Sequence, residues 1–154
     1  MKKIILLLIV LFLSNDRSMA QITQLTIGVD GFTCSLCAKG VEEQFKSLDF
    51  VKSVKTDLKN TTFRLLFKNS PKINILEIKD AVEDGGFSLR DITLEAEGTI
   101  KGSSSEGYFL STPNSPDMRL IDLKQDLSAG DKIKIKGNVI PASSSISVTS
   151  ITKI

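Results

Sequence analysis

The sequence contains no histidine and no tryptophan, and only two of its 154 residues are cysteine, Cys34 and Cys37. Without histidine the chain lacks the commonest general base, and it shows neither a nucleophile elbow nor a phosphate-binding glycine loop. We therefore predict that the protein is not an enzyme. The absence of histidine also means that a site for a soft metal ion must be built mainly from the two cysteine thiolates.

Long apolar runs are also scarce, and the only one spans Ile4 to Leu13, directly after two lysines. A membrane-spanning helix needs roughly 20 apolar residues, so a permanent anchor is the weaker alternative. The segment Ser18-Met19-Ala20 follows as a small-x-small cleavage pattern. Residues 1–20 are therefore predicted to be a secretory signal peptide. The mature protein would begin at Gln21, be periplasmic or secreted, and have no stable membrane insertion after cleavage.

An excess of charge is absent once this leader is removed. The whole chain has 20 basic and 18 acidic residues, and the leader holds Lys2, Lys3 and Arg17 against Asp16, which leaves 17 of each. A neutral protein has no long-range attraction for nucleic acid or for an anionic membrane. Nucleic acid is therefore not an expected partner.

Residues 21–94 alternate between strand and helix patterns. The predicted elements are a strand through Leu25, Ile27 and Val29, a helix over Leu36–Leu48, a hairpin of Val51–Leu58 and Thr61–Phe67 turning at Lys59-Asn60, a helix through Ile75, Ile78 and Val82 that stops at Gly85-Gly86, and a strand over Phe87–Leu94. The order βαββαβ predicts an α+β, ferredoxin-like sandwich with a four-stranded antiparallel sheet and both helices on one face.

Both cysteines lie between the first strand and the first helix, in Gly31-Phe32-Thr33-Cys34-Ser35-Leu36-Cys37. A C-x-x-C pair at a helix start brings two sulfurs within reach of one ion, or of each other. We expect Cys37, within the first turn, to lose its proton more readily, because a helix N-terminus favours negative charge. Cys34, on the loop, would meet an incoming ion first.

Two thiolates suit a soft ion that accepts low coordination, so Cu(I) or Hg(II) fits better than Zn(II), which normally takes four ligands. Three alternatives remain open. The chain could be a thiol-disulfide redox protein that uses these two cysteines, although its order of elements differs from that of thioredoxin-like enzymes. The pair could be a structural disulfide, or the chain could be an envelope interaction module whose cysteines are incidental.

With Val29–Cys37 after the first strand and Gly85-Gly86-Phe87 after the second helix, residues 21–94 resemble the heavy-metal-associated domain. That family includes copper chaperones, N-terminal modules of copper and zinc transport ATPases, and the periplasmic mercury-binding protein. The resemblance implies a non-catalytic carrier or scavenger that holds Cu(I) on Cys34 and Cys37, with Hg(II) and Zn(II) as alternatives. It also implies a membrane metal transporter or another metal-receiving protein as partner.

Two aromatic residues bear on this resemblance. Phe32 stands where the family usually carries a methionine buried under the loop. Phe87 matches an aromatic residue that the ATPase modules carry near their metal site, and it is equally well explained as part of the core. The motif thus departs from the family at one position.

Residues 95–154 change to short strands with serine-rich and glycine-rich turns, which predicts a second domain. The expected strands are Glu97–Lys101, Tyr108–Thr112, Arg119–Leu123, Lys132–Val139 and Ser145–Ile151. Five strands in this length resemble a small all-β barrel of the oligonucleotide/oligosaccharide-binding (OB) fold. Lysines alternate along one strand at 132, 134 and 136, where we expect them to keep an edge strand soluble rather than to bind an anion.

Overall fold

The computed structural model describes residues 21–31, 34–68 and 72–154; the predicted signal peptide and Phe32 lie outside this part of the chain. Its elements are β1 (Gln21–Asp30), α2 (Ser35–Ser47), β2 (Val51–Asp57), β3 (Thr62–Phe67), α3 (Ile75–Asp84), β4 (Ser88–Ser103), β5 (Gly107–Thr112), β6 (Ser115–Ile121), β7 (Lys132–Ile140), a short 3₁₀ turn (Pro141–Ser143) and β8 (Ser145–Lys153). Among these residues, no helix has the length and apolar character needed to cross a membrane.

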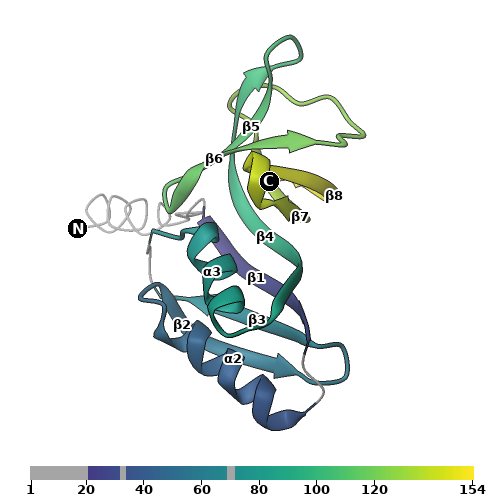
Figure 1. Cartoon of the computed structure of the whole chain (residues 1–154). Helices are drawn as coiled ribbons and strands as arrows, with labels where there is room; N and C mark the ends of the chain where they lie inside the picture. The colour runs from purple at the N-terminus through teal and green to yellow at the C-terminus, as the bar shows by residue number, and fades with distance from the viewer. Residues whose placement is uncertain (1–20, 32–33, 69–71) are drawn as a thin grey trace, which may run out of the picture.

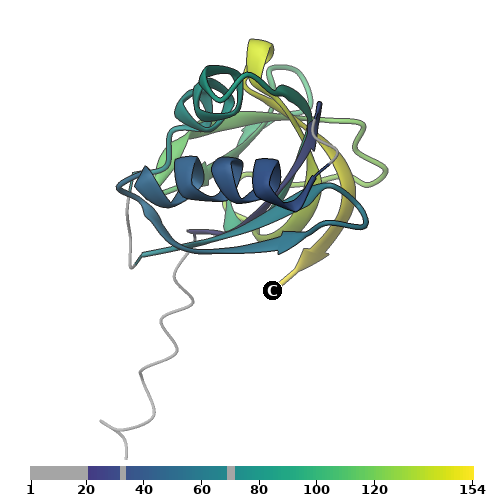
Figure 2. The ribbon, with the colours of Figure 1, turned by 60° about the horizontal axis from the view of Figure 1, so that its bottom comes forward.

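The first half folds as its periodicity predicts. Strands β2, β3, β1 and β4 lie side by side in that order and are antiparallel. Figures 1 and 2 show α2 and α3 on the same side of this sheet. Phe45 of α2 is fully buried, and its ring meets Phe63 of β3 edge to face at 5.4 Å between centroids. The predicted βαββαβ order is thereby confirmed.

Strand β4 joins the two halves of the chain. The sequence predicted separate strands over Phe87–Leu94 and Glu97–Lys101, but the structure has one 16-residue strand over Ser88–Ser103. One edge of β4 pairs with β1 and then with β5, while its other edge pairs with β7. The predicted boundary between residues 94 and 95 falls inside this strand. Whether the two sides fold independently stays a prediction.

The second half is a closed ring of strands, in the order β4-β5-β6-β8-β7 and back to β4 (Figure 1). The pair β6–β8 is parallel, and the other pairs of the ring are antiparallel. The prediction that the lysines lie on an edge strand was wrong, because β7 is paired with β4 on one side and with β8 on the other. Its Lys134 and Lys136 instead form ion pairs with Glu97 and Glu95 of β4.

Asn114, in the turn between β5 and β6, ties the barrel to the first half. Its side-chain oxygen accepts a hydrogen bond from the backbone N–H of Ile22 at 3.1 Å, and its backbone oxygen accepts one from Ile73 at 2.7 Å. Asn114 is only 3% exposed, so these bonds lie away from solvent. Polar groups without a partner are costly at such a depth, and the junction is therefore specific. The buried core runs without a break from the helix-covered sheet into the barrel.

Candidate metal site

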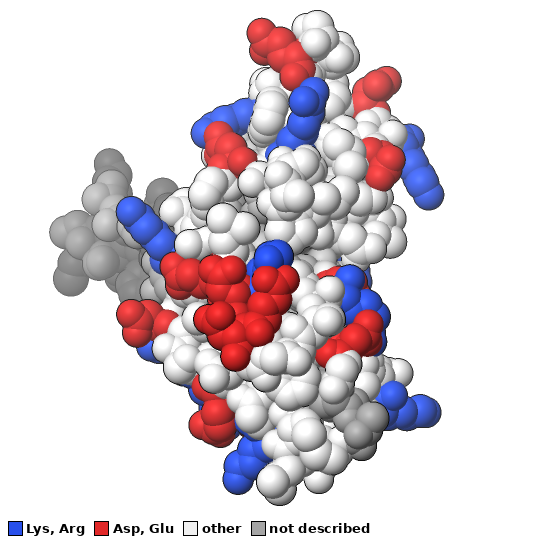
Figure 3. Space-filling view, viewed as in Figure 1, with Lys and Arg blue, Asp and Glu red and all other residues white. Residues whose placement is uncertain are grey.

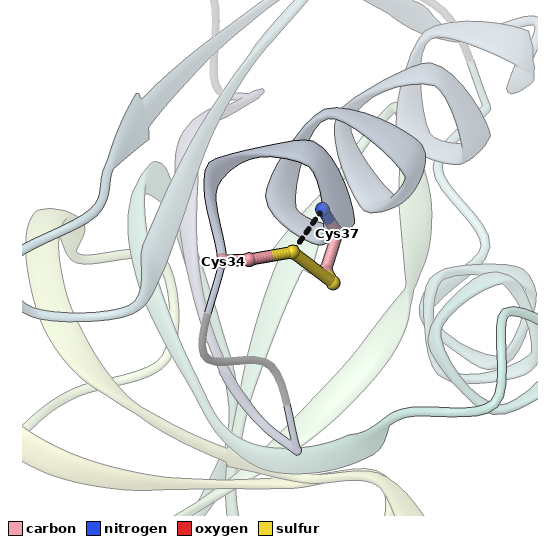
Figure 4. Close-up of a disulfide and its surroundings, with 2 residues drawn as sticks. All are labelled: Cys34 and Cys37. Carbon is pink, nitrogen blue, oxygen red and sulfur yellow. Dashed lines mark hydrogen bonds between the residues drawn. A yellow bond between two sulfur atoms is a disulfide. The ribbon is translucent and has the colours of Figure 1, made fainter.

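Cys34 and Cys37 lie at the start of α2, the helix that follows β1 in the chain. Cys34 is the N-cap residue, with an extended backbone, and Cys37 lies in the first turn. Their Cα atoms are 5.4 Å apart, and the two sulfurs are joined in a disulfide (Figure 4). The C-x-x-C spacing therefore brings the sulfurs together, as the sequence predicted.

The backbone N–H of Cys37 donates a hydrogen bond to Sγ of Cys34 at 3.2 Å, drawn as the dashed line in Figure 4. From the sequence we expected the helix N-terminus to favour loss of the proton from the Cys37 thiol. In the structure, the donor of the first turn points at Cys34, because a cap side chain accepts from the N–H groups two or three residues later. Both sulfurs thus lie at the positive end of the helix, and Cys34 receives the direct bond.

The site is open to the outside. Cys34 is exposed, Cys37 is half-buried, and Leu36 between them is 81% exposed. Ala38 and Val41, one and four residues after Cys37, are buried and hold α2 against the sheet. Cys34 is therefore the more exposed of the two, and the order in which an ion meets the sulfurs stays a prediction.

Phe87 lies next to the loop that carries the cysteines. A Cβ placed on Gly31 would lie 3.8 Å from its ring, and the ring is half-buried against the core. Gly31 has φ +101°, a conformation that residues with a side chain rarely adopt. The two roles considered for Phe87, core packing and cover for the site, are compatible in this position.

The described residues offer the two sulfurs and no cluster of three or more histidine, cysteine, aspartate and glutamate side chains for a metal ion. Met118, whose thioether sulfur is another soft ligand, lines a cavity of about 130 Å³ beside the start of α3. That cavity adjoins Asn114, which bonds Ile22 at the opposite end of β1 from the cysteine loop. At about 3.3 Å per residue, the ends of the ten-residue strand β1 are roughly 30 Å apart, so Met118 does not join the cysteines.

The surface over α3 is acidic, and Figure 3 shows the carboxylates gathered there. The helix carries Glu77, Asp80, Glu83 and Asp84 against a single lysine, Lys79, which pairs with Glu83. Helix α2 is balanced instead: Lys46 pairs with Glu42 and Glu43, and its hydrogen bond holds the pKa of Glu42 below the usual 4.5. The α3 surface therefore favours the approach of positively charged groups.

A βαββα unit closed by the first part of β4, with a pair of cysteines at the start of its first helix, defines a small α+β module. The heavy-metal-associated domain family matches residues 26–88. The copper chaperone CopZ of Bacillus subtilis (strain 168) is 33% identical over 66 residues, which cover 43% of this chain and 94% of that protein. The copper chaperone CopZ of Staphylococcus aureus (strain bovine RF122 / ET3-1) is 30% identical over 67 residues, covering 44% of this chain and 97% of that protein. The chain therefore belongs to the heavy-metal-associated domain family.

Among solved structures, a CopZ metallochaperone is 29% identical and has a TM-score of 0.41, over 44% of this chain and 100% of its own. These matches concern the helix-covered half of the chain. The family model and the two CopZ sequences establish a metal-binding domain of the predicted family and ferredoxin-like fold, and the barrel lies largely outside the matched residues 26–88.

Proposed function

We propose that this protein is an exported carrier or scavenger of soft metal ions, which binds Cu(I) between Sγ of Cys34 and Sγ of Cys37. The observation that carries the proposal is the pair of sulfurs at an open helix start, in a chain of the heavy-metal-associated family. Before the pair can bind a metal, a dithiol reductant must pass two electrons and two protons to the disulfide and is itself oxidised to a disulfide. The two thiols then lose their protons as they bind one ion.

Cu(I) is favoured over the two alternatives by the number of ligands. Two thiolates satisfy Cu(I) in low coordination, and Hg(II) has a similar preference for sulfur. Zn(II) normally takes four ligands, and the described residues supply no third side chain of the usual kind near the cysteines. Zinc would therefore need ligands from a partner or from solvent.

A second candidate function is thiol-disulfide exchange, and the disulfide between Cys34 and Cys37 favours it. An exposed Cys34 beside a half-buried Cys37 is an arrangement in which one sulfur can be attacked first. The metal carrier is preferred because this pair lies on the ferredoxin-like frame of a metal-binding family.

The remaining proposals concern location, partner and the barrel. The apolar leader with its cleavage pattern supports a periplasmic or secreted protein that begins at Gln21. A membrane metal transporter, or another metal-receiving protein, would take the ion. The strand order of the barrel, with its parallel β6–β8 pair, supports an OB-like fold for residues 95–154, which we propose docks that partner.

The location is tested by mass analysis of the protein recovered from its own compartment without reduction. We expect a chain that begins at Gln21, because the cleavage pattern ends at Ala20. The same measurement reports the oxidation state of the cysteines and the bound metal. A membrane-bound product that keeps residues 4–13 would contradict export as a cleaved protein.

The function is tested on the full mature chain, reduced and free of metal. We expect one Cu(I) per chain to be taken from a moderate Cu(I) chelator, because a single closed two-sulfur site is available. A parallel assay follows the reduction of a disulfide substrate. No uptake of copper or mercury, together with efficient turnover of the disulfide, would reject the carrier in favour of the redox protein.

A further inference from the structure

Arg90 connects the strand that leads into the cysteine loop with a distant turn. Its guanidinium donates to the carboxylate of Asp30 at 3.0 Å, and Asp30 is the last residue of β1 before the loop. It also donates to Oγ1 of Thr61 at 2.7 Å and to the backbone oxygen of Asn60 at 3.1 Å, in the turn between β2 and β3. A fourth bond, at 2.9 Å, goes to the neighbouring Asp91.

The backbone is built to send this side chain across β1. Asp91 pairs with Gly28 and Leu89 pairs with Val29, so Arg90 is an extra residue with no partner in the ladder, a β-bulge. Bulges redirect a side chain and are frequent beside functional sites. The bulge accounts for an arginine of β4 that reaches the far side of the neighbouring strand.

Gly28 provides the room for this crossing. A Cβ at position 28 would lie 2.7 Å from one terminal nitrogen of Arg90 and 2.5 Å from the carboxylate of Asp91. Gly28 pairs with β4 on one side and with Thr62 of β3 on the other. Since β1 lies between β4 and β3, the guanidinium passes over the one residue of β1 that has no side chain.

We propose that Arg90 is a positioning residue, which fixes the base of the cysteine loop by bridging Asp30 to the β2–β3 turn across Gly28. The proposal rests on the proposed function of Cys34 and Cys37. The loop is then held at both ends, by Arg90 at Asp30 and by the cap hydrogen bond at Cys34. With Asp30 and Cys34 fixed in this way, less ordering is needed when the sulfurs of Cys34 and Cys37 close on an ion or on each other.

The test uses the full mature chain with three substitutions at the bridge. Arg90→Gln removes the charge and the bridge, whereas Arg90→Lys keeps the charge but cannot form several planar bonds at once. Gly28→Ala keeps the Arg90 side chain itself but adds a Cβ in the space that its guanidinium occupies. Lys101→Met is the control, because it breaks an exposed ion pair with Asp117 in the barrel.

Two quantities are measured, together with thermal unfolding as a check on folding. The first is Cu(I) affinity from chelator competition, which we expect to fall about tenfold in all three bridge variants, because the loop must then be ordered on binding. The second is the metal-free equilibrium with dithiothreitol, which passes two electrons and two protons to the protein disulfide. We expect the disulfide to become at least about threefold easier to reduce, because the two thiols are held together less well.

The bridge is supported if both quantities move in these variants and stay unchanged in Lys101→Met. It is rejected if Arg90→Gln and Gly28→Ala remain within about twofold of the wild type, or if Arg90→Lys matches the wild type. If the wild type takes up no copper, the proposed function fails, while the equilibrium with dithiothreitol still decides the role of Arg90. The two failures are thus distinguishable.

Discussion

Replacing either cysteine, as Cys34→Ser or Cys37→Ser, should remove tight Cu(I) binding from the reduced protein. The structure brings the two sulfurs together and offers no further cluster of ligands among the described residues. The second sulfur binds an ion already held by the first, and losing such a linked contact costs about 10²–10⁴-fold in affinity. We therefore expect each variant to lose at least about a hundredfold, measured by competition with a Cu(I) chelator without oxygen.

A matched control for this experiment is Ser35→Ala, which changes an exposed residue between the two cysteines and leaves both thiols in place. It should bind copper within about threefold of the wild type, because it removes no sulfur ligand. A cysteine variant that binds as tightly as this control would show that the ion is held elsewhere.

The same cysteine variants also separate metal carriage from thiol exchange. In an oxidoreductase, attack by the first thiolate forms a mixed disulfide, and the second thiol then releases it. Losing the second thiol would therefore trap the mixed disulfide with a substrate. Exposed Cys34 would be the attacking residue and Cys37 the resolving one, so Cys37→Ser is the variant in which the trapped species would accumulate.

The sequence predicted the first half of the fold because its elements follow local patterns. Val41 and Phe45 lie at helical spacing, and both are buried on one face of α2. The turn at Lys59-Asn60 was also predicted, and there Asp57 accepts hydrogen bonds from the backbone of both residues. Such features depend on residues close in the chain, which a single sequence displays directly.

The continuity of β4 was missed, although its pattern is present in the sequence. Every second residue from Ile92 to Ile100 is buried, but the small residues Ala96 and Gly98 interrupt the series of large apolar side chains. Gly98 is small because β5 approaches closely: a Cβ there would lie 2.6 Å from the side chain of Leu110. The size of a residue at such a crossing is set by a partner strand, which periodicity does not reveal.

The candidate site was predicted in the same uneven way. Cys34 and Cys37 were predicted because the C-x-x-C spacing alone brings two sulfurs within reach of one ion or of each other. Arg90 was not predicted, because the partners that it bridges, Asp30 and Asn60, are 60 and 30 residues away in the chain. Gly28, a glycine inside a strand, is the sequence feature that could have indicated the close approach of Arg90 at the β-bulge.

The largest structural test concerns the part of the chain that the barrel stabilises. A fragment from Gln21 to Ala96 keeps α2, α3 and the sheet, including the contact between Phe45 and Phe63. It loses the hydrogen bonds of Asn114 to Ile22 and Ile73, and the pairing of β4 with β7. Each lost hydrogen bond costs about 1 kcal/mol, and the newly exposed apolar side chains add to this cost.

We expect this fragment to remain folded, with a free energy of unfolding several kcal/mol below that of the full mature chain, because it retains the buried Phe45–Phe63 core but loses the junction. Dispersed NMR shifts and urea denaturation of both proteins measure this, with Asn114→Ala in the full chain isolating the part due to that side chain. Its Cu(I) affinity should stay within about threefold of the full chain, because both sulfurs lie at the end of β1 away from Asn114. A disordered fragment beside a folded full chain would mean that β4 makes the two halves one folding unit, and a large loss of affinity in a folded fragment would place a ligand in the barrel.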